Sequence, residues 1–256
     1  MNSGNIAIIG GTGFENLPAE IFAEPIDLIT EAGPARVLSI SDNYTEPVKL
    51  YFLSRHGAEH GIAPHQINYR ANTLALLDLG VRYAFATNAV GSLTTDLPTG
   101  SFVVLDDFID FTKQRLLSIG TTTNWRHTDF SAPYSPLLRQ HLMQSALLHQ
   151  VRAVDGGVYV CCEGPRFESP AEVRLFRQWG GDVVGMTGLP EAIFAREAGI
   201  EYAALAIVTN LAAGLTAIPV DHAEVVRHMG EALPLLRGIC MGAARLLVES
   251  WALDRV

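Results

Sequence analysis

Short apolar runs that alternate with longer segments of helical character constrain the fold of this chain more than any other feature. Several runs are apolar almost throughout, which is typical of strands covered on both faces. The predicted strands are Ile6–Ile9, Val48–Leu53, Tyr83–Thr87, Phe102–Leu105, Val158–Cys161, Asp182–Val184 and Tyr202–Val208. The predicted helices are Asn68–Leu79, Pro136–His149, Pro170–Trp179, Pro190–Ala198 and Asp221–Ser250. This alternation predicts one α/β domain over residues 1–256, with a central mixed β-sheet flanked by helices.

Proline and glycine mark several boundaries between these elements. Prolines stand near the first turn of three predicted helices, where a missing N–H costs nothing, and Gly199 follows a helix as a common stop signal. Pro234 lies inside the last predicted helix and should kink it. The stretch from Lys113 to Pro133 is the longest irregular segment, and long loops of this kind are often functional.

The composition disfavours several classes of protein. With 48% hydrophobic residues and a net charge of −9, the chain can bury a large core, and neither nucleic acid nor an anionic membrane is expected as the main partner. The three cysteines, Cys161, Cys162 and Cys240, form no C-x-x-C pair, which favours a reduced, cytoplasmic protein. We expect no metal site, no signal peptide and no membrane span, and the expected ligands are small molecules.

Two glycine-containing turns follow apolar strands and would bring backbone N–H groups close to an anion. The first, Gly10-Gly11-Thr12-Gly13, adds the hydroxyl of Thr12 as a donor. It lacks the last glycine of the dinucleotide pattern G-x-G-x-x-G, and an ordinary strand-to-helix turn is the alternative. The second lies in "ATNAVGSL", where Gly91 indicates a second close approach to the same ligand or a tight β-turn.

Arg55 and His56 stand in "LSRHGAEH", directly after a predicted buried strand. At the end of such a strand both side chains would face a cleft. Arginine binds phosphate well because its planar fork makes two charge-assisted contacts at once. The alternative is a surface Arg–His pair that forms salt bridges.

Three later motifs supply candidates for contacts to a planar heterocycle and a sugar. In "CCEGPRFES", Phe167 offers an aromatic face and Glu168 an acceptor for an N–H, although a core Phe beside a helix-start Glu is equally common. Met186 and Thr187 follow a strand in "GMTGLPEA", where ordinary packing and capping are the alternatives. Asn210, just beyond the most apolar strand, either caps a loop or reads a ligand edge.

Together and in this order, the motifs are far more specific than any one of them. The chain resembles the trimeric purine nucleoside phosphorylase and methylthioadenosine phosphorylase family in "IIGGTGFE", "SRHGAEH", "NYRAN", "TNAVGSL", "EGPRFES", "VGMTGLPEA" and "VTN", which run from residue 8 to 210. The resemblance implies one α/β domain around a large mixed sheet, assembled as a homotrimer. It implies a pentosyltransferase of purine salvage in which free phosphate attacks C1′ of a nucleoside and releases the base and a ribose 1-phosphate. Inorganic phosphate is then a co-substrate, and no cofactor is required.

The resemblance also implies roles at matching positions. The residues expected to bind phosphate are Gly11, Thr12, Arg55, His56, Ala89 and Thr187. Met186 is expected to pack under the ribose, Phe167 to stack on the base, and Val90 and Gly91 to line the base pocket. The sugar becomes cationic as the bond to the base breaks, and a phosphate held by fixed donors stabilises that charge and is aligned for attack.

Glu168 and Asn210 discriminate between classes of purine. Family members that act on 6-aminopurines look like "EGPRFSS" and carry Asp at the base-reading position, whereas those that act on 6-oxopurines have Glu and Asn, as here. A 6-oxopurine donates its N1–H to such a glutamate, and the asparagine amide donates to the N7/O6 edge, whereas adenine offers a bare N1. We expect hypoxanthine- or guanine-type bases, and the catalytic candidates are Asn210, Glu168 and Arg55.

Three sequence features bear on which group the nucleoside substrate carries at its 5′ position. After Asn210 the chain is small and apolar up to Val220, which favours a methylthio group and resembles bacterial methylthioinosine phosphorylases. The segment "HTDFSAPY", starting at His127, resembles the loop that a neighbouring subunit supplies over the 5′ end. His222 matches, across a gap, a histidine that binds a 5′-hydroxyl in ordinary purine nucleoside phosphorylases, or it is an exposed residue of the last helix.

The expected function is phosphorolysis of S-methyl-5′-thioinosine, which gives hypoxanthine and 5-methylthioribose 1-phosphate. The first alternative is a general purine nucleoside phosphorylase that acts on inosine and guanosine, and the second is a methylthioadenosine phosphorylase. Outside this class stand a nucleosidase that uses water, a nucleotide-dependent oxidoreductase and a non-catalytic nucleoside-binding module.

Overall fold

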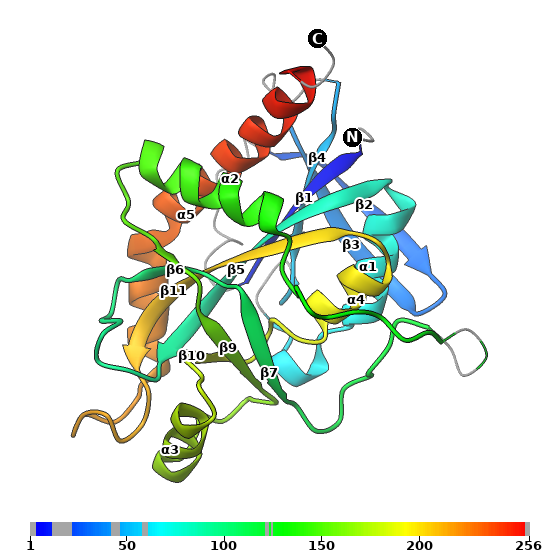
Figure 1. Ribbon diagram of the computed structural model, residues 1–256. Helices are drawn as coiled ribbons and strands as arrows, with labels where there is room; N and C mark the ends of the chain where they lie inside the picture. Colours follow the sequence, from blue (N-terminus) through cyan, green and yellow to red (C-terminus); the bar gives the residue numbers. More distant parts are fainter. Residues whose placement is uncertain are drawn as a thin grey trace.

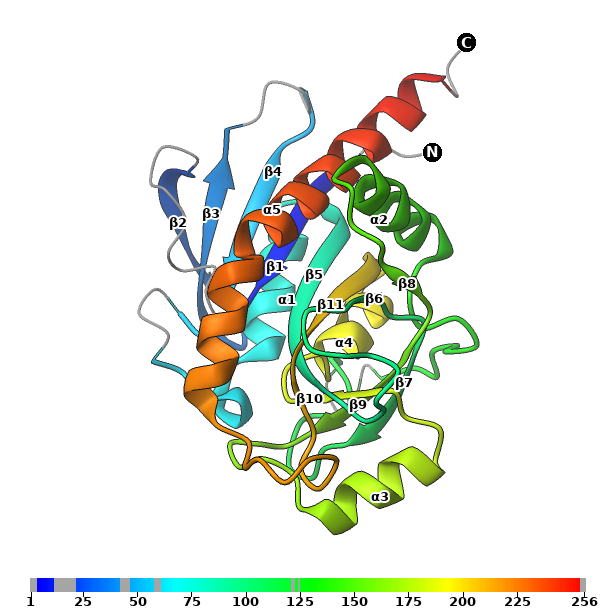
Figure 2. The same ribbon diagram turned by 90° about the vertical axis from the view of Figure 1, so that its left-hand side faces the viewer.

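One mixed sheet of 11 strands organises the described part of the chain in the computed structural model (Figures 1 and 2). The structure describes residues 4–11, 22–41, 47–57, 61–120, 123 and 125–253, without the side chains of 22–24 and 253. The strands are β1 (Asn5–Gly10), β2 (Phe22–Thr30), β3 (Gly33–Ile40), β4 (Leu50–Ser54), β5 (Val81–Ser92), β6 (Phe102–Val104), β7 (Asp107–Phe111), β8 (Val154–Asp155), β9 (Val158–Cys162), β10 (Val183–Gly185) and β11 (Glu201–Leu211). The helices are α1 (Tyr69–Asp78), α2 (Pro136–Leu148), α3 (Pro170–Gln178), α4 (Glu191–Glu197) and α5 (His222–Leu253), with a short 3-10 helix at Pro64–Gln66.

The strand order places β1 and β5 at the centre of the sheet. The order is β2-β3-β4-β1-β5-β10-β9-β7, and β11 also pairs with β5 and carries β6 and β8 beyond it. β1, β4, β5 and β11 run parallel, whereas β3 and β10 run antiparallel to their neighbours β4 and β5. The sheet is therefore mixed, as the sequence predicts.

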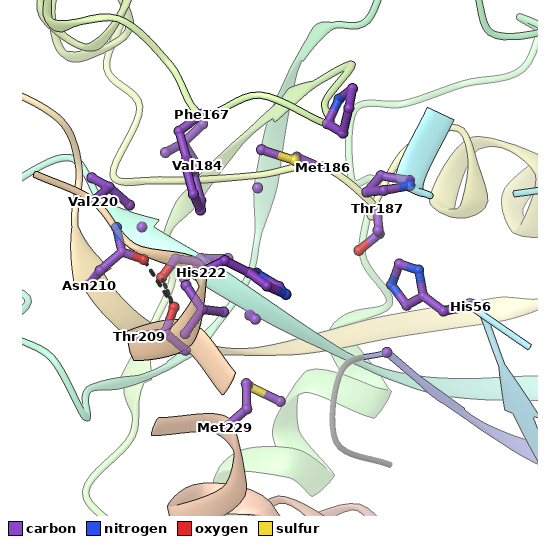
Figure 3. A pocket seen from close by; sticks show the side chains of 18 of the residues that line it. His56, Phe167, Val184, Met186, Thr187, Thr209, Asn210, Val220, His222 and Met229 are labelled. Atoms are coloured by element: carbon purple, nitrogen blue, oxygen red, sulfur yellow. Dashed lines mark hydrogen bonds between the residues drawn. The ribbon is translucent and has the colours of Figure 1, made fainter. Parts of the chain in front are cut away.

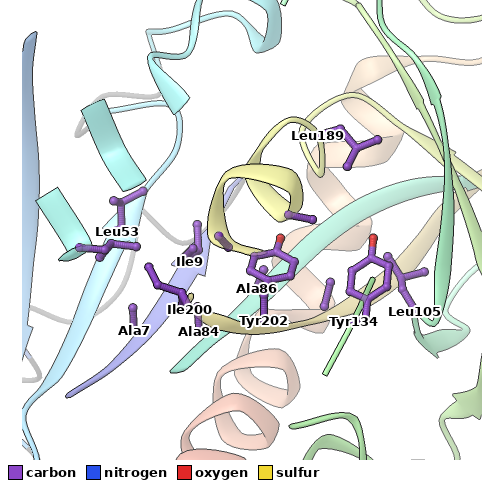
Figure 4. Packing of buried hydrophobic residues seen from close by; sticks show 14 of the residues in the cluster. Ala7, Ile9, Leu53, Ala84, Ala86, Leu105, Tyr134, Leu189, Ile200 and Tyr202 are labelled. Atoms are coloured by element: carbon purple, nitrogen blue, oxygen red, sulfur yellow. The ribbon is translucent and has the colours of Figure 1, made fainter. Parts of the chain in front are cut away.

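Helices cover both faces of the sheet, and this explains why its central strands are apolar throughout. Along β1, Ala7 and Ile9 belong to the core under α1 and α4, while Ile6 and Ile8 belong to the core under α2 and α5. Figure 4 shows the first of these cores, with side chains from β1, β5 and β11 packed together. Alternate residues of one strand thus build two separate cores.

A bulge interrupts the pairing of β11 with β5 near the end of both strands. Val208 pairs with Val90, but Asn210 rather than Thr209 pairs with Gly91. A bulge adds one residue to one strand and re-aims the side chains that follow it. This shift sets the direction of Asn210.

The predicted helices are all present, and their observed ends differ from the predicted ends by no more than three residues. Pro190 precedes α4 as its N-cap, and α5 ends at Leu253 rather than Ser250. Gly199 has the positive φ of +71° expected after a helix. Pro234 lies within α5, and Figure 2 shows that helix changing direction along its length. No helix in the described residues is long and apolar enough to cross a membrane.

Four strands are not among the predicted ones: β2, β3, β7 and β8. β2 and β3 form an antiparallel hairpin at the edge of the sheet, where only some of the side chains are buried, and they contain Pro25 and Pro34. Proline is tolerated at sheet edges, where a missing donor is harmless. β5 extends to Ser92, well past the predicted end at Thr87, because its second half continues to pair with β11.

Candidate active site

A cavity of about 440 Å³ opens where the carboxyl ends of β1, β4, β10 and β11 meet the second half of β5 (Figure 3). Thirteen residues predicted from the sequence line it: Gly11, Arg55, His56, Ala89, Val90, Gly91, Phe167, Glu168, Met186, Thr187, Asn210, Val220 and His222. Thr12 lies outside the described residues, and His127 is not part of the lining. Figure 3 shows His56 and Thr187 at one end, and Phe167, Asn210 and Val220 toward the other.

Arg55 is buried at the first end and does not form the surface salt bridge considered as an alternative. Its side chain is fully enclosed, and its Nε and Nη2 donate to the two carboxylate oxygens of Glu191 at 2.7 and 2.6 Å. Nη1 donates to the carbonyl of Thr87 at 2.6 Å. Burial alone would lower the pKa of Arg55, but the charge and hydrogen bonds of Glu191 raise it, so the guanidinium stays cationic.

His56 and Gly11 lie beside Arg55 at the same end of the cavity. Nδ1 of His56 lies 2.8 Å from the carbonyl oxygen of Ile62, and since a carbonyl only accepts, Nδ1 carries a proton. A Cβ on Gly11 would lie 3.5 Å from Nη1 of Arg55 and 3.6 Å from Nε2 of His56. The space over Gly11 is therefore bordered by both basic side chains.

The turn that carries Met186 and Thr187 is held by hydrogen bonds from its backbone to the side chain of Tyr159. The hydroxyl of Tyr159 accepts the backbone N–H groups of Thr187 and Gly188, both at 3.2 Å. Nδ2 of Asn88 donates to Oγ1 of Thr187 at 3.2 Å, so the hydroxyl hydrogen of Thr187 can point to another acceptor. Tyr159 and Asn88 therefore hold the Thr187 hydroxyl at the end of the cavity that contains His56 (Figure 3).

Glu168 lines the opposite part of the cavity, just before the capping box that starts α3. Ser169 and Glu172 form that box and so fix the direction in which the preceding residues leave the helix. Glu168 is 9% exposed, and its Oε1 has no hydrogen-bond partner among the described residues. Burial raises the pKa of this carboxyl, although contacts with its own backbone and with Cys162 oppose the rise.

Asn210 faces the same region with its amide orientation defined. Its Nδ2 donates to the carbonyl of Leu211 at 3.0 Å, and its Oδ1 lies 3.1 Å from the hydroxyl of Thr209. Because a carbonyl only accepts, the nitrogen must face Leu211, which leaves a second N–H of the same amide for a ligand. A Cβ on Gly91 would lie 3.3 Å from this nitrogen, so glycine keeps the space beside it open.

The start of α5 forms the remaining wall. His222 is the first residue of the helix, exposed to solvent, and Val225 and Met229 follow it on the same face and line the cavity. His222 is thus the exposed residue of the last helix that one alternative described, and it also borders the cavity. Val225 and Met229 were not predicted from the sequence, although spacings of three and seven from a helical His222 place them on its face.

Other residues of the site were also missed. Thr87 and Thr209 line the cavity, and Glu191 stands directly behind Arg55. Glu191 stands within the motif "GMTGLPEA", but its partner Arg55 lies 136 positions away in the chain, and no local pattern shows that pairing.

His127 lies on the long irregular loop, exposed to solvent, with its ring 5.2 Å from that of Trp125. The described part of this loop is tied to α4, because Ser118 and the N–H of Ile119 donate to the carboxylate of Glu197 at 3.0 and 2.7 Å. Figure 1 shows the loop extending away from the sheet. The structure describes no group of three metal-ligating side chains in residues 4–11, 22–41, 47–57, 61–120, 123 and 125–253, and all three cysteines are buried without a disulfide.

This fold and cavity define a nucleoside-phosphorylase type of protein, and the chain belongs to the phosphorylase superfamily, whose model matches residues 5–245. A 6-oxopurine nucleoside phosphorylase of Pyrococcus furiosus is 45% identical over 88% of this chain and 86% of the relative. A "Probable S-methyl-5'-thioinosine phosphorylase" of Methanothermobacter thermautotrophicus is also 45% identical, over 88% of this chain and 78% of the relative. The solved methylthioadenosine phosphorylase of Schistosoma mansoni, in complex with adenine, superimposes with a TM-score of 0.88 at 31% identity, over 95% and 91% of the two chains.

Proposed function

We propose that this enzyme catalyses the phosphorolysis of 6-oxopurine nucleosides and that S-methyl-5′-thioinosine is its preferred substrate. The observation that carries the proposal is the unpaired, buried carboxylate oxygen of Glu168, which shares the cavity with the open amide N–H of Asn210. An acceptor and a donor in one cavity complement N1–H and the N7/O6 edge of a 6-oxopurine. The names of the Pyrococcus furiosus and Methanothermobacter thermautotrophicus relatives support the same class of base.

Phosphate binds at the other end of the cavity, over Gly11. The N–H groups of Arg55, the imidazole of His56 and the hydroxyl of Thr187 surround this position. The anion is then held by fixed donors next to the sugar, where it stabilises the positive charge that develops on the sugar and attacks C1′ in line.

The purine leaves with negative charge building on its ring. The amide N–H of Asn210 stabilises that charge at N7 or O6, while Glu168 keeps the base oriented through its N1–H. Adenine would place its bare N1 against the carboxylate of Glu168 and its 6-amino group against the amide N–H of Asn210, a mismatch that should lower kcat/KM by at least about 100-fold.

The wall at the start of α5 supports a methylthio group at the 5′ position. Val225 and Met229 are 8% and 1% exposed and present apolar surface to the cavity together with Val220. Such a surface stabilises a thiomethyl group and leaves a hydroxyl without a partner. His222 at the rim is the observation that favours the second candidate, a general phosphorylase of inosine and guanosine.

A panel of five nucleosides, assayed with saturating phosphate, tests both parts of the proposal. We expect the highest kcat/KM for methylthioinosine, lower values for inosine and guanosine, and at least about 100-fold lower values for methylthioadenosine and adenosine. Inosine or guanosine far above methylthioinosine would replace the proposal by the general phosphorylase. Adenosine-type substrates at the top would contradict the role given to Glu168 and Asn210.

The assembly and the cellular setting belong to the same proposal. We infer a homotrimer in which the His127 region of a neighbouring subunit covers the 5′ end, because His127 stands away from the cavity of its own chain. Inorganic phosphate is the co-substrate, and no cofactor or metal takes part. Three unbonded cysteines support a cytoplasmic enzyme of purine salvage.

A further inference from the structure

We propose that Glu191, supported by Tyr202, is a positioning residue that holds the guanidinium of Arg55 with two N–H groups directed at the phosphate. This inference rests on the proposed function, because it assigns Arg55 to a phosphate. Neither Glu191 nor Tyr202 lines the cavity, so both act through Arg55. The inference explains how a single arginine is kept in one orientation before any anion arrives.

The hydrogen bonds of Arg55 to the protein leave two of its guanidinium N–H groups for a ligand. A guanidinium has five N–H groups, and three of them are used: two by Glu191 and one by the carbonyl of Thr87. In the part of the chain that the structure describes, the other two have no acceptor. Nη1 borders the open space over Gly11, where its distance to a Cβ would be 3.5 Å.

Glu191 is itself fully committed to this arrangement. Its Oε2 accepts from Nε of Arg55, and its Oε1 accepts from Nη2 and from the hydroxyl of Tyr202 at 2.7 Å. Tyr202 is 3% exposed and lies on β11, so it cannot move without disturbing the core. Glu191 comes from the first turn of α4, Tyr202 from β11 and the carbonyl of Thr87 from β5, so three separate elements hold the side chain of Arg55.

The electrostatics require a partner of this kind. Arg55 is 1% exposed and Glu191 5%, so an unpaired guanidinium here would have no water to solvate it while the phosphate site is empty. The carboxylate of Glu191, bound along one edge of the guanidinium, keeps Arg55 charged and leaves the other edge of the guanidinium for the ligand. Without Glu191, the arginine would have to find its orientation each time phosphate binds, and phosphate affinity would fall.

The test compares Glu191→Gln, Tyr202→Phe and Glu197→Gln with the wild-type enzyme. Glutamine keeps the size of Glu191 but sets an amide N–H against a guanidinium N–H. Glu197 is a matched control, because it is a second buried glutamate on α4, 7% exposed, that bonds to Ser118 and Ile119 instead of Arg55. The readouts are the KM for phosphate, the KM for the nucleoside, and the rise in melting temperature that phosphate produces in the absence of nucleoside.

For Glu191→Gln we expect the KM for phosphate to rise at least about ten-fold, with the nucleoside KM changed less than about three-fold and most of the phosphate-induced melting shift lost. Tyr202→Phe should raise the phosphate KM by about three-fold, and it decides the matter if Glu191→Gln does not fold. Glu197→Gln should keep the wild-type phosphate KM. A folded Glu191→Gln or Tyr202→Phe enzyme with unchanged phosphate KM would overturn the inference. A wild-type enzyme that turns over without phosphate would instead overturn the proposed function.

Discussion

At the scale of single residues, two polar atoms in the cavity wall are buried without a hydrogen-bond partner among the described residues. Oε1 of Glu168 and Oγ1 of Thr87 are both buried in the cavity wall and have no partner among the described residues. Such groups cost free energy in the empty protein, since they have left water without a new hydrogen bond. Their position in one cavity indicates that a ligand supplies the missing bonds.

Replacing Glu168 by glutamine should separate activity from stability. Burial raises the pKa of Glu168, so its ionised form destabilises the folded state, and the protonated form restores that stability at pH values below the shifted pKa. Glu168→Gln should therefore keep or raise the melting temperature at pH 7 while lowering kcat/KM for methylthioinosine by about 100-fold. A melting scan and initial rates on the same preparation check both.

The raised pKa of Glu168 also predicts how kcat/KM of the wild-type enzyme falls at low pH. The acceptor for N1–H is the carboxylate, which is present above the pKa of Glu168 and disappears as pH falls through it. Because that pKa is raised, kcat/KM should begin to fall at a higher pH than an ordinary glutamate would give. An acid limb that is unchanged in Glu168→Gln would show that another group causes it.

Asn210→Asp should move the preference toward 6-aminopurines. A carboxylate at this position accepts a hydrogen bond from a 6-amino group, and it repels the O6 of hypoxanthine. The measurement is the ratio of kcat/KM for methylthioinosine to that for methylthioadenosine, which we expect to fall at least about ten-fold. An unchanged ratio would remove Asn210 from the base-reading role.

At the scale of elements, α2 and α5 pack closely because glycines in α5 meet side chains of α2. A Cβ on Gly242 would overlap the hydroxyl of Ser145, which donates to the carbonyl of Ile239 at 2.8 Å across the two helices. A Cβ on Gly238 would lie 2.8 Å from Nε2 of His149. The contact therefore admits no side chain on that stripe of α5.

Two alanine substitutions in α5 should have opposite effects. Gly242→Ala should lower the free energy of unfolding by about 1–3 kcal/mol, since Ser145 must shift. Gly230→Ala, in the same helix but with open space around its Cβ, should raise it by about 0.5–1 kcal/mol. Chemical denaturation measures both, and a gain of stability in both variants would show that helix propensity, not packing, controls the effect of substitutions at Gly242.

Elements with strong periodicity were predictable from the sequence, and those fixed by long-range contacts were not. The central strands and all five helices follow from apolar runs, prolines and Gly199. The β2–β3 hairpin lies at the sheet edge with alternating exposure, so no continuous apolar run marks it. In the site, short motifs indicated the lining residues, whereas Glu191 is defined by a partner from another element.

At the scale of the whole molecule, the long loop carries apolar side chains away from the rest of the chain. Leu117 and Trp125 are 76% and 62% exposed, and His127 stands beside Trp125. A surface of this kind is typical of a contact between proteins. The proposed trimer would cover it and place His127 at a neighbour's cavity.

The His127→Ala enzyme tests this arrangement. We expect it to remain trimeric by light scattering, and its KM for methylthioinosine should rise about three- to ten-fold with little change in the KM for phosphate. A matched substitution, Trp125→Ala, should weaken the trimer itself because it removes apolar contact area. A wild-type enzyme that is monomeric and fully active would contradict the proposed assembly.

The most direct test of the central claim is the identity of the sugar product. Purified enzyme is incubated with S-methyl-5′-thioinosine in phosphate-free buffer and in buffer with saturating phosphate, and the products are separated and identified by mass. We predict hypoxanthine and 5-methylthioribose 1-phosphate in equal amounts with phosphate, and almost no turnover without it. Equal turnover in both buffers, with free 5-methylthioribose as the product, would contradict the assignment of the pocket over Gly11 and beside Arg55 to phosphate.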